Sequence, residues 1–175
     1  WDVVPDYESM VQVITDDKQA MQAIKRIVKD PRTEYLAIDY ETNALKPETQ
    51  GAAIWSVSLS NGYETIAAPW YEGVRKACKW AFRSPVPKIA CNMKFEERWT
   101  VHEFGVGIRN WVWDTMQAAH WMHSRPGITS IKFQAYAKLG VSEYDAGVHS
   151  FFKSKPGTLN NIKQVPVNTL LVYNG

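Results

Sequence analysis

The sequence predicts an α/β fold with three layers, in which helices flank both faces of a mixed central sheet. Short apolar runs, which are typical of strands, alternate along the chain with longer segments that have helical spacing. The dipeptide Asn61-Gly62 joins two of these runs into a hairpin and makes part of the sheet antiparallel. A chain of 175 residues that is 45% hydrophobic and 22% charged can bury one core without disulfides. We therefore expect one domain over residues 1–175.

The first forty residues predict a strand, a helix and a central strand. Residues 10–15 alternate apolar and polar side chains, as a half-buried strand does. Asp16 or Asp17 then offers a cap for a helix that ends at Pro31. Residues 35–40 form a short, nearly continuous apolar run, which favours a strand covered on both faces.

The hairpin follows in residues 55–60 and 63–68, two alternating runs separated by Asn61-Gly62. These two residues suit a type I′ turn, because both positions of that turn need a positive φ. A helix over residues 72–82 and an apolar strand over residues 88–91 come next.

The second half of the chain predicts mainly helices. A helix over residues 94–104 ends at Gly105 and offers side chains for packing, namely Phe95, Trp99, Val101 and Phe104. After it we expect a strand at residues 111–114, helices at residues 115–123, 130–139 and 167–173, and a loop-rich segment at residues 145–164. Asp114 is placed to cap the first of these helices.

The charge is unevenly distributed although the net charge is only +2. Residues 1–50 contain ten acids and six bases, whereas residues 115–175 contain two acids and six bases. An anionic polymer could lie along the basic third while a cation binds near the acidic one. The alternative is that these lysines form an ordinary solvated surface.

The sequence shows no feature of a membrane or secreted protein. Its apolar runs are shorter than the roughly 20 residues of a membrane span, and the N-terminus lacks a basic stretch followed by an apolar one. Cys78 and Cys91 lack the spacing of a zinc site and indicate reduced thiols. We expect a cytoplasmic protein without a membrane partner.

Two acids, Asp39 and Glu41, come at the end of the predicted central strand and face the same way because strand side chains alternate. Like charges roughly 6 to 7 Å apart repel each other unless a counter-charge is present. Mg²⁺ or Mn²⁺ would remove this cost because these ions prefer carboxylate oxygens. The alternative is that both acids lie beyond the strand end in water.

A second group of polar residues, Asn92 to Glu96, follows the strand at residues 88–91. Because the carboxyl ends of parallel strands meet at one edge of an α/β sheet, Glu96 could face Asp39 and Glu41 there. Taken alone, Glu96 is equally consistent with a surface acid on a helix.

These residues resemble the motifs of the DnaQ-like (DEDD, Tyr-type) 3′→5′ exonucleases. Asp39-Tyr40-Glu41-Thr42, with Leu45 and Pro47 after it, is similar to the first motif, D-x-E-T-x-x-L. Asn92-Met93-Lys94-Phe95-Glu96 is similar to the second motif, N-x-K-[FY]-D. Asp114 to Ala119 is similar to the D-T-M-x-A-A segment of proofreading domains in family A DNA polymerases, and residues 165–175 are similar to the start of the third motif, Y-x-x-x-D.

The resemblance implies a ribonuclease H-like fold and two Mg²⁺ or Mn²⁺ ions that hold the attacking and leaving oxygens of a phosphodiester. It implies that Asp39 bridges both ions, that Glu41 supports the ion that activates water, and that Glu96 serves the second ion. Tyr173 would orient the attacking water.

The same resemblance implies a set of nucleic-acid contacts. Residues placed to hold the terminal nucleotide are Thr42, Leu45, Asn92 and Phe95, with Leu45 against the last base. Lys132 belongs to the basic third, which would attract a single strand without base preference.

The sequence departs from the family pattern at two points. Glu96 stands where the family has Asp, so we expect altered geometry at the second ion. The third motif needs a carboxylate four residues after Tyr173, and the sequence ends at Gly175. We therefore expect a domain cut just before the third-motif Asp, with weak activity as it stands.

The sequence is thus interpreted as the proofreading 3′→5′ exonuclease domain of a phage or bacterial DNA polymerase, located in the cytoplasm of the bacterial or infected cell. Its expected partners are the 3′ end of single-stranded DNA and a polymerase domain in the same chain. One alternative is an RNA-trimming exonuclease of the same superfamily. The other is a non-catalytic domain that binds nucleic acid or braces a polymerase.

Overall fold

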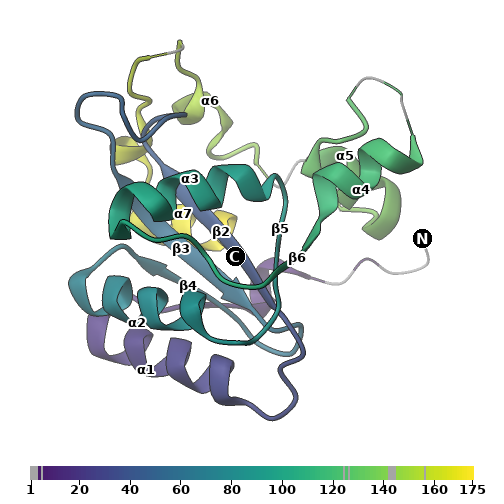
Figure 1. Cartoon of the computed structure of the whole chain (residues 1–175). Helices are drawn as coiled ribbons and strands as arrows, with labels where there is room; N and C mark the ends of the chain where they lie inside the picture. Colours follow the sequence, from purple (N-terminus) through teal and green to yellow (C-terminus); the bar gives the residue numbers. More distant parts are fainter. Residues whose placement is uncertain (1–3, 5, 124, 126, 142–144, 156) are drawn as a thin grey trace.

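The computed structural model describes residues 4, 6–123, 125, 127–141, 145–155 and 157–175 (Figure 1). The described strands form one six-stranded sheet with the order β1-β4-β3-β2-β5-β6. Its strands are β1 (Val11–Val13), β2 (Leu36–Thr42), β3 (Ile54–Ser60), β4 (Thr65–Pro69), β5 (Lys88–Ala90) and β6 (Trp111–Asp114). The helices are α1 (Asp17–Lys29), α2 (Glu72–Arg83), α3 (Met93–Phe104), α4 (Thr115–Met122), α5 (Ile131–Leu139), α6 (His149–Phe152) and α7 (Val167–Asn174), with 3₁₀ turns at Glu8–Met10 and Ile162–Gln164.

The sheet is mixed, which confirms the predicted fold class. β3 pairs antiparallel with both β2 and β4, whereas β1 with β4, β2 with β5, and β5 with β6 are parallel pairs. The hairpin therefore supplies the antiparallel part, as expected, and β2 lies between antiparallel and parallel neighbours.

The two faces of the sheet differ in chemistry because, over residues 38–41, apolar residues of β2 pair with apolar residues of β3, and polar residues pair with polar ones. Ile38 and Tyr40 point to an apolar face that packs under α1, α2 and α3. Asp39 pairs with Ser58, and Glu41 pairs with Ser56, on the other face. α7 packs across β1, β3 and β4 on this polar face, so helices lie on both sides of the sheet (Figure 1). The strand alternation thus separates the core from the acidic residues.

Side-chain caps fix how α1 and α2 lie together on the apolar face. Asp16 Oδ1 accepts a hydrogen bond from the Gln19 N–H at 2.8 Å and begins α1. Asp17 reaches across to α2 and accepts hydrogen bonds from the N–H groups of Gly73 and Val74, both at 2.9 Å. One helix therefore caps the next, which orients α2 on the sheet.

The hairpin between β3 and β4 is confirmed, but the predicted type I′ turn is wrong. The loop has four residues, since Ser60 pairs with Thr65, and within it only Gly62 has a positive φ, of 83°. The Asn61 side chain accepts hydrogen bonds from the N–H groups of Tyr63 and Glu64 instead. This local bonding replaces the two-residue turn because the asparagine side chain competes with the backbone.

The helix predicted over residues 94–104 forms, but one of its predicted core residues is wrong. Val101 is 44% exposed, whereas the polar Glu96 and Thr100 are buried. The Thr100 hydroxyl lies 3.0 Å from the Tyr40 hydroxyl, so a polar contact draws this face of α3 to β2.

The loop-rich segment expected at residues 145–164 contains more structure than the sequence suggested. It carries α6 and a 3₁₀ turn, and it contributes to a second apolar cluster made of Val148, Ile162, Val165 and Leu170, with Phe151, Phe152 and Tyr173 packed against it. This cluster supports α7 from outside the main core. Among the described residues, no helix is long and apolar enough to cross a membrane.

Candidate active site

A cleft of about 1250 Å³ lies on the polar face of the sheet. Residues from β2, β3, α5 and α7 line it, and Asp39, Glu41, Ser58, Tyr173 and Asn174 are among them. Asp39, Glu41 and Tyr173 were predicted as site residues from the sequence, and the structure brings these three to one cavity.

Asn174 connects the last helix to the central strand at Asp39. Its Nδ2 donates a hydrogen bond to Asp39 Oδ2 at 2.8 Å, and its Oδ1 accepts one from Ser56 Oγ at 2.7 Å. Asn174 is 5% exposed, so these bonds are shielded from water. Sequence reasoning missed both Asn174 and the serines. Two features of the sequence could have indicated them: Asn174 is next to Tyr173, and the serines alternate with apolar residues along β3.

Glu96 lies at the start of α3, which contacts β2, and it does not line the cleft. β5 pairs only with Leu36 and Ala37 of β2, so the edge of β2 beyond them is open, and α3 begins there. Glu96 is 2% exposed, and its Oε2 has no hydrogen-bond partner. A buried carboxylate oxygen without a partner is costly, which marks Glu96 as a group that lacks a ligand.

Burial raises the pKa of all three carboxyl groups, and neighbouring acids raise the pKa of Glu41 and Glu96 further. Burial raises the pKa of Asp39, and the Asn174 hydrogen bond partly offsets this. Burial raises the pKa of Glu41 well above its ordinary value, and the charges of Asp39 and Glu96 raise it further. Burial also raises the pKa of Glu96, with Asp39 as the next cause. Glu96 is therefore close enough to both other acids for their charges to interact.

No cation among the described residues neutralises this group of acids. The ion pairs of the described residues all involve other carboxylates. Within the described ranges, no three His, Cys, Asp or Glu side chains stand together closely enough to hold a metal ion as they are. The donors nevertheless fit a hard divalent cation, because all are carboxylate oxygens and one has no other partner. An ion binding here would draw the carboxylates together.

The last residue of β2 and the loop after it provide two of the predicted nucleotide-binding positions, Thr42 and Leu45. Thr42 is buried, and its hydroxyl donates a hydrogen bond to the Ala44 carbonyl at 2.7 Å. Leu45 is 62% exposed and is free to contact a ligand. Neither residue lines the cleft itself.

Asn160 holds this loop from a distant part of the chain. Its side chain donates to the Thr42 carbonyl at 2.9 Å, and its backbone N–H donates to the Asn43 carbonyl at 2.8 Å. Leu159 packs so closely on Gly51 that a Cβ there would lie 3.3 Å from Leu159 Cδ1. No local pattern in the sequence indicates this contact, because it joins segments more than one hundred residues apart.

Asn92 and Phe95 begin and support α3. Asn92 has a left-handed backbone, with φ 65° and ψ 53°, and its N–H donates to Asp114 Oδ1 at 3.0 Å. Phe95 is half-buried and packs on Trp99, with ring centroids 6.2 Å apart. The structure thus places both residues outside the lining of the cleft.

Asp114 caps two helices at once. It accepts hydrogen bonds from the N–H groups of Asn92 and Met93 before α3, and from those of Met116 and Gln117 at the start of α4. The predicted cap on α4 is confirmed, and the link to α3 was not foreseen. Asp114 therefore fixes the second motif relative to β6.

Tyr173 and Lys132 both contact the segment that includes α6. The Tyr173 ring packs on Phe152, with centroids 5.4 Å apart. Lys132 on α5 forms an ion pair with Asp145 and lies 3.4 Å from His149 Nδ1. The charge of Lys132 is thus partly satisfied within the protein.

The fold and the acids together define a class: a ribonuclease H-like α/β domain with carboxylates on its central strand and beside it. The family described as 3′-5′ exonuclease matches residues 11–140. The chain therefore belongs to the 3′-5′ exonucleases, within the DEDD superfamily. A search of curated proteins finds no match.

Solved structures share this fold. Escherichia coli RNase D, an exoribonuclease involved in structured RNA processing, is 15% identical with a TM-score of 0.63, and the match covers 93% of this chain and 42% of that one. The catalytic core of RRP6 from Trypanosoma brucei is 14% identical with a TM-score of 0.64 and coverages of 94% and 44%. Brucella melitensis NrnC with bound Mg²⁺ is 16% identical with a TM-score of 0.59 and coverages of 94% and 70%. The chain spans less than half the length of the RNase D and RRP6 chains.

Proposed function

We propose that residues 1–175 form one metal-dependent exonuclease domain that removes nucleotides from the 3′ end of a single strand. The observation that supports this most is the group of three carboxyls, the half-buried Asp39 and Glu41 and the buried Glu96, whose pKa values are all raised and which have no ion-pair partner among the described residues. Such a group is unfavourable in an empty site and becomes favourable when Mg²⁺ or Mn²⁺ binds.

In this mechanism Asp39, Glu41 and Glu96 would hold the metal, as two ions if the family pattern applies. When bound, it would make a water acidic enough to ionise near neutral pH and would neutralise charge on the phosphate. Asn174 orients Asp39 through the 2.8 Å hydrogen bond. Tyr173 faces the same cleft and orients the attacking water, while the exposed Leu45 packs on the terminal base.

We further propose that the substrate is DNA and that the domain proofreads for a polymerase domain in the same protein. This rests on the resemblance of Asp114 to Ala119 to the proofreading segment and on the basic residues after residue 115, Lys132 among them. Thr42, Asn92 and Phe95 would support the terminal nucleotide from the loop and helix that border the carboxylates.

RNA is the second candidate substrate, because two of the structures that share the fold are RNA-processing enzymes by their descriptions, RNase D and a Trypanosoma brucei RNase D in complex with RNA U12. Turnover of DNA and RNA single strands with the same base sequence separates the two candidates. Preference for DNA supports proofreading, and preference for RNA replaces it with RNA trimming.

Asp39→Asn tests the catalytic proposal directly. We expect Mn²⁺-dependent shortening of a single strand by the wild-type chain, and a decrease of about 10³-fold or more in the variant, because several kcal/mol of charge stabilisation by the metal are lost. Gel analysis of a 5′-labelled oligonucleotide measures the rate. Asp30→Asn, which removes a carboxylate that is paired with Arg32 and does not line the cleft, is the matched control. Equal rates in Asp39→Asn and wild type, or no shortening by either, would favour a non-catalytic domain.

A further inference from the structure

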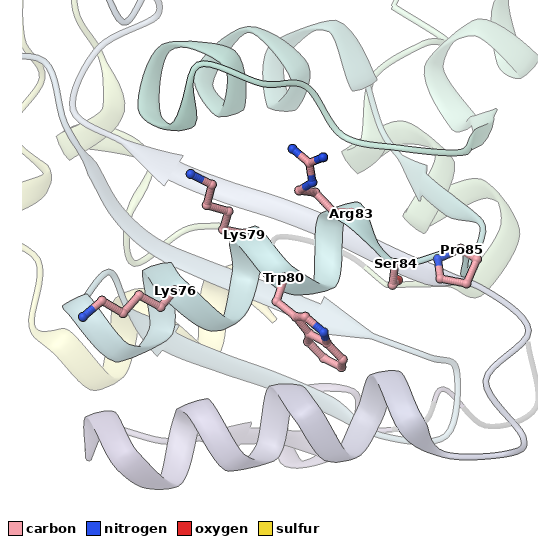
Figure 2. Close-up of a pocket in the computed structure, with 6 residues that line it drawn as sticks. All are labelled: Lys76, Lys79, Trp80, Arg83, Ser84 and Pro85. Atoms are coloured by element: carbon pink, nitrogen blue, oxygen red, sulfur yellow. The ribbon is translucent and has the colours of Figure 1, made fainter.

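A basic groove runs along the outer surface of α2. Its lining consists of Lys76, Lys79, Trp80, Arg83, Ser84 and Pro85, and its volume is about 530 Å³ (Figure 2). We call these six residues the α2 groove. A volume of this size is within the range of pockets that hold small ligands or parts of larger ones.

Helical spacing explains why the cations share one side of α2. Lys76, Lys79 and Arg83 follow one another at intervals of three and four residues, so they lie above one another on the helix. The opposite side of the helix is buried, since Ala77, Cys78 and Ala81 pack in the core. The cations of the groove therefore lie on the surface and do not contribute to the packing of the core.

The charge of the groove is largely unneutralised. Among the described ion pairs, Lys79 and Arg83 take part in none, and Lys76 pairs only with Glu72, with both side chains at least 70% exposed. An exposed pair at this spacing contributes little and is easily exchanged for another anion. The lining itself contains no carboxylate, so an anionic ligand meets attraction along its whole length.

Trp80 gives the groove an aromatic surface among these cations. The side chain is 41% exposed, although tryptophan rings are usually mostly buried. Lys29 of α1 lies above the ring, with its Nζ 6.0 Å from the centroid, and adds a further positive charge. Cations beside an exposed aromatic ring match a ligand that carries phosphates and flat bases.

The α2 groove is separate from the carboxylate cleft. α2 packs on the apolar face of the sheet, through residues such as Phe82, whereas Asp39 and Glu41 lie on the polar face. A strand held at the α2 groove is therefore not the terminal nucleotide at the carboxylates.

We propose that the α2 groove is a second binding site for single-stranded nucleic acid, in which a base stacks on Trp80 and the flanking phosphates contact Lys79 and Arg83. The site binds a part of a strand that is not being cleaved. Its binding needs no metal and none of the three acids, so this inference stands independently of the catalytic proposal.

Photo-crosslinking in EDTA tests the site without turnover. The probe is a single strand of about 12 thymidines with 5-iododeoxyuridine substitutions, a length within the usual site sizes of single-strand binding proteins. Trypsin cleaves after Lys79 and Arg83, so mass spectrometry locates a crosslink at Trp80 in the peptide of residues 80–83. We expect this crosslink in the wild-type chain. Lys79→Glu/Arg83→Glu removes both cleavage sites, so its crosslink is sought in the peptide of residues 77–88, and we expect the yield to fall about tenfold because both phosphate contacts are reversed in charge.

A matched variant and a competitor complete the experiment. Lys18→Glu/Lys25→Glu changes the net charge equally on the exposed surface of α1, outside the groove, and we expect it to retain the crosslink. Trp80→Ala should weaken binding measured by anisotropy about fivefold through lost stacking. The proposal is overturned if Trp80 gives no crosslink, if both double variants lose it equally, or if polyglutamate displaces the probe as well as unlabelled oligothymidylate does. Loss of metal-dependent shortening in the separate rate assay would affect only the catalytic proposal.

Discussion

Glu96 illustrates at the scale of one residue how the site differs from the core around it. It is buried, one of its oxygens lacks a hydrogen-bond partner, and the charge of Asp39 opposes its ionisation. A neutral side chain of similar size would avoid these costs. A carboxylate at this position is expected if it binds a cation. We therefore expect the free energy of unfolding to be lower when the cation is removed.

The raised pKa of Glu96 predicts how stability depends on pH. Its folded-state pKa is above the ordinary value of 4.5, so the native state binds the proton more tightly than the unfolded state. Its contribution to stability is complete below pH 4.5 and is lost as the pH rises toward the folded-state pKa. In EDTA, we therefore expect the free energy of unfolding to fall between pH 5 and pH 8, measured by urea denaturation.

Glu96→Gln removes this titration and should reduce the pH dependence, of which a part remains because the pKa values of Asp39 and Glu41 are also raised. At pH 8 in EDTA we expect its Tm to exceed that of the wild type by about 3 °C, the size that about 1 kcal/mol produces in a chain of this length. Adding Mg²⁺ at pH 8 should raise the Tm of the wild type more than that of the variant. Glu34→Gln, at an exposed position, serves as control. A variant with the wild-type pH profile would contradict the role given to Glu96.

At the scale of elements, the loop between β2 and β3 depends on a segment near the C-terminus. Asn160 bonds to the carbonyls of Thr42 and Asn43, and Arg98 on α3 binds Glu48 through two hydrogen bonds of 3.1 and 2.8 Å. The exposed Leu45 lies between these two attachments in the sequence. Its position relative to the cleft is thus set by elements that are remote in the chain.

Asn160→Ala should loosen this loop. We expect the free energy of unfolding to fall by about 1 kcal/mol because the Thr42 carbonyl loses its partner. We also expect KM for a single strand to rise about threefold with kcat little changed, since Leu45 is proposed to bind the terminal base rather than to react. Steady-state kinetics and urea denaturation measure these effects. Thr158→Ala is the matched control, because its hydroxyl bonds only within its own turn, to the Lys155 carbonyl. A change in kcat alone would contradict this role.

The elements themselves were largely predictable from the sequence, because their signals are local. Spacing of apolar residues located the strands and helices to within a few residues, and Asp16 and Asp114 acted as caps as expected. The type I′ turn failed because the Asn61 side chain bonds to the backbone of its own loop. The prediction that Val101 packs in the core was wrong because the side of α3 that carries the buried Glu96 and Thr100 faces β2, where Thr100 contacts Tyr40.

At the scale of the whole molecule, what the sequence could not predict depends on contacts between distant segments. Asp39, Glu41 and Tyr173 line one cleft. Strand alternation places the two acids on one face, whereas only the order of the motifs pointed to Tyr173. Asn174 joins β2 across 135 positions, and neither spacing nor composition carries information about such a contact. The α2 groove was also missed, since a stripe of lysines on a helix resembles any solvated surface until the exposed Trp80 is located beside it.

The double cap by Asp114 has a consequence for how the molecule opens locally. One carboxylate accepts hydrogen bonds from Asn92 and Met93 and also from Met116 and Gln117, so the starts of α3 and α4 cannot fray independently. Amide hydrogen exchange should therefore treat these four positions as one cooperative unit. In Asp114→Ala all four amides should exchange faster, whereas Asp16→Ala, which removes a cap from one helix, should accelerate Gln19 alone. Faster exchange at Met116 and Gln117 only would contradict this, because it would show that the start of α3 is stabilised by interactions other than those with Asp114.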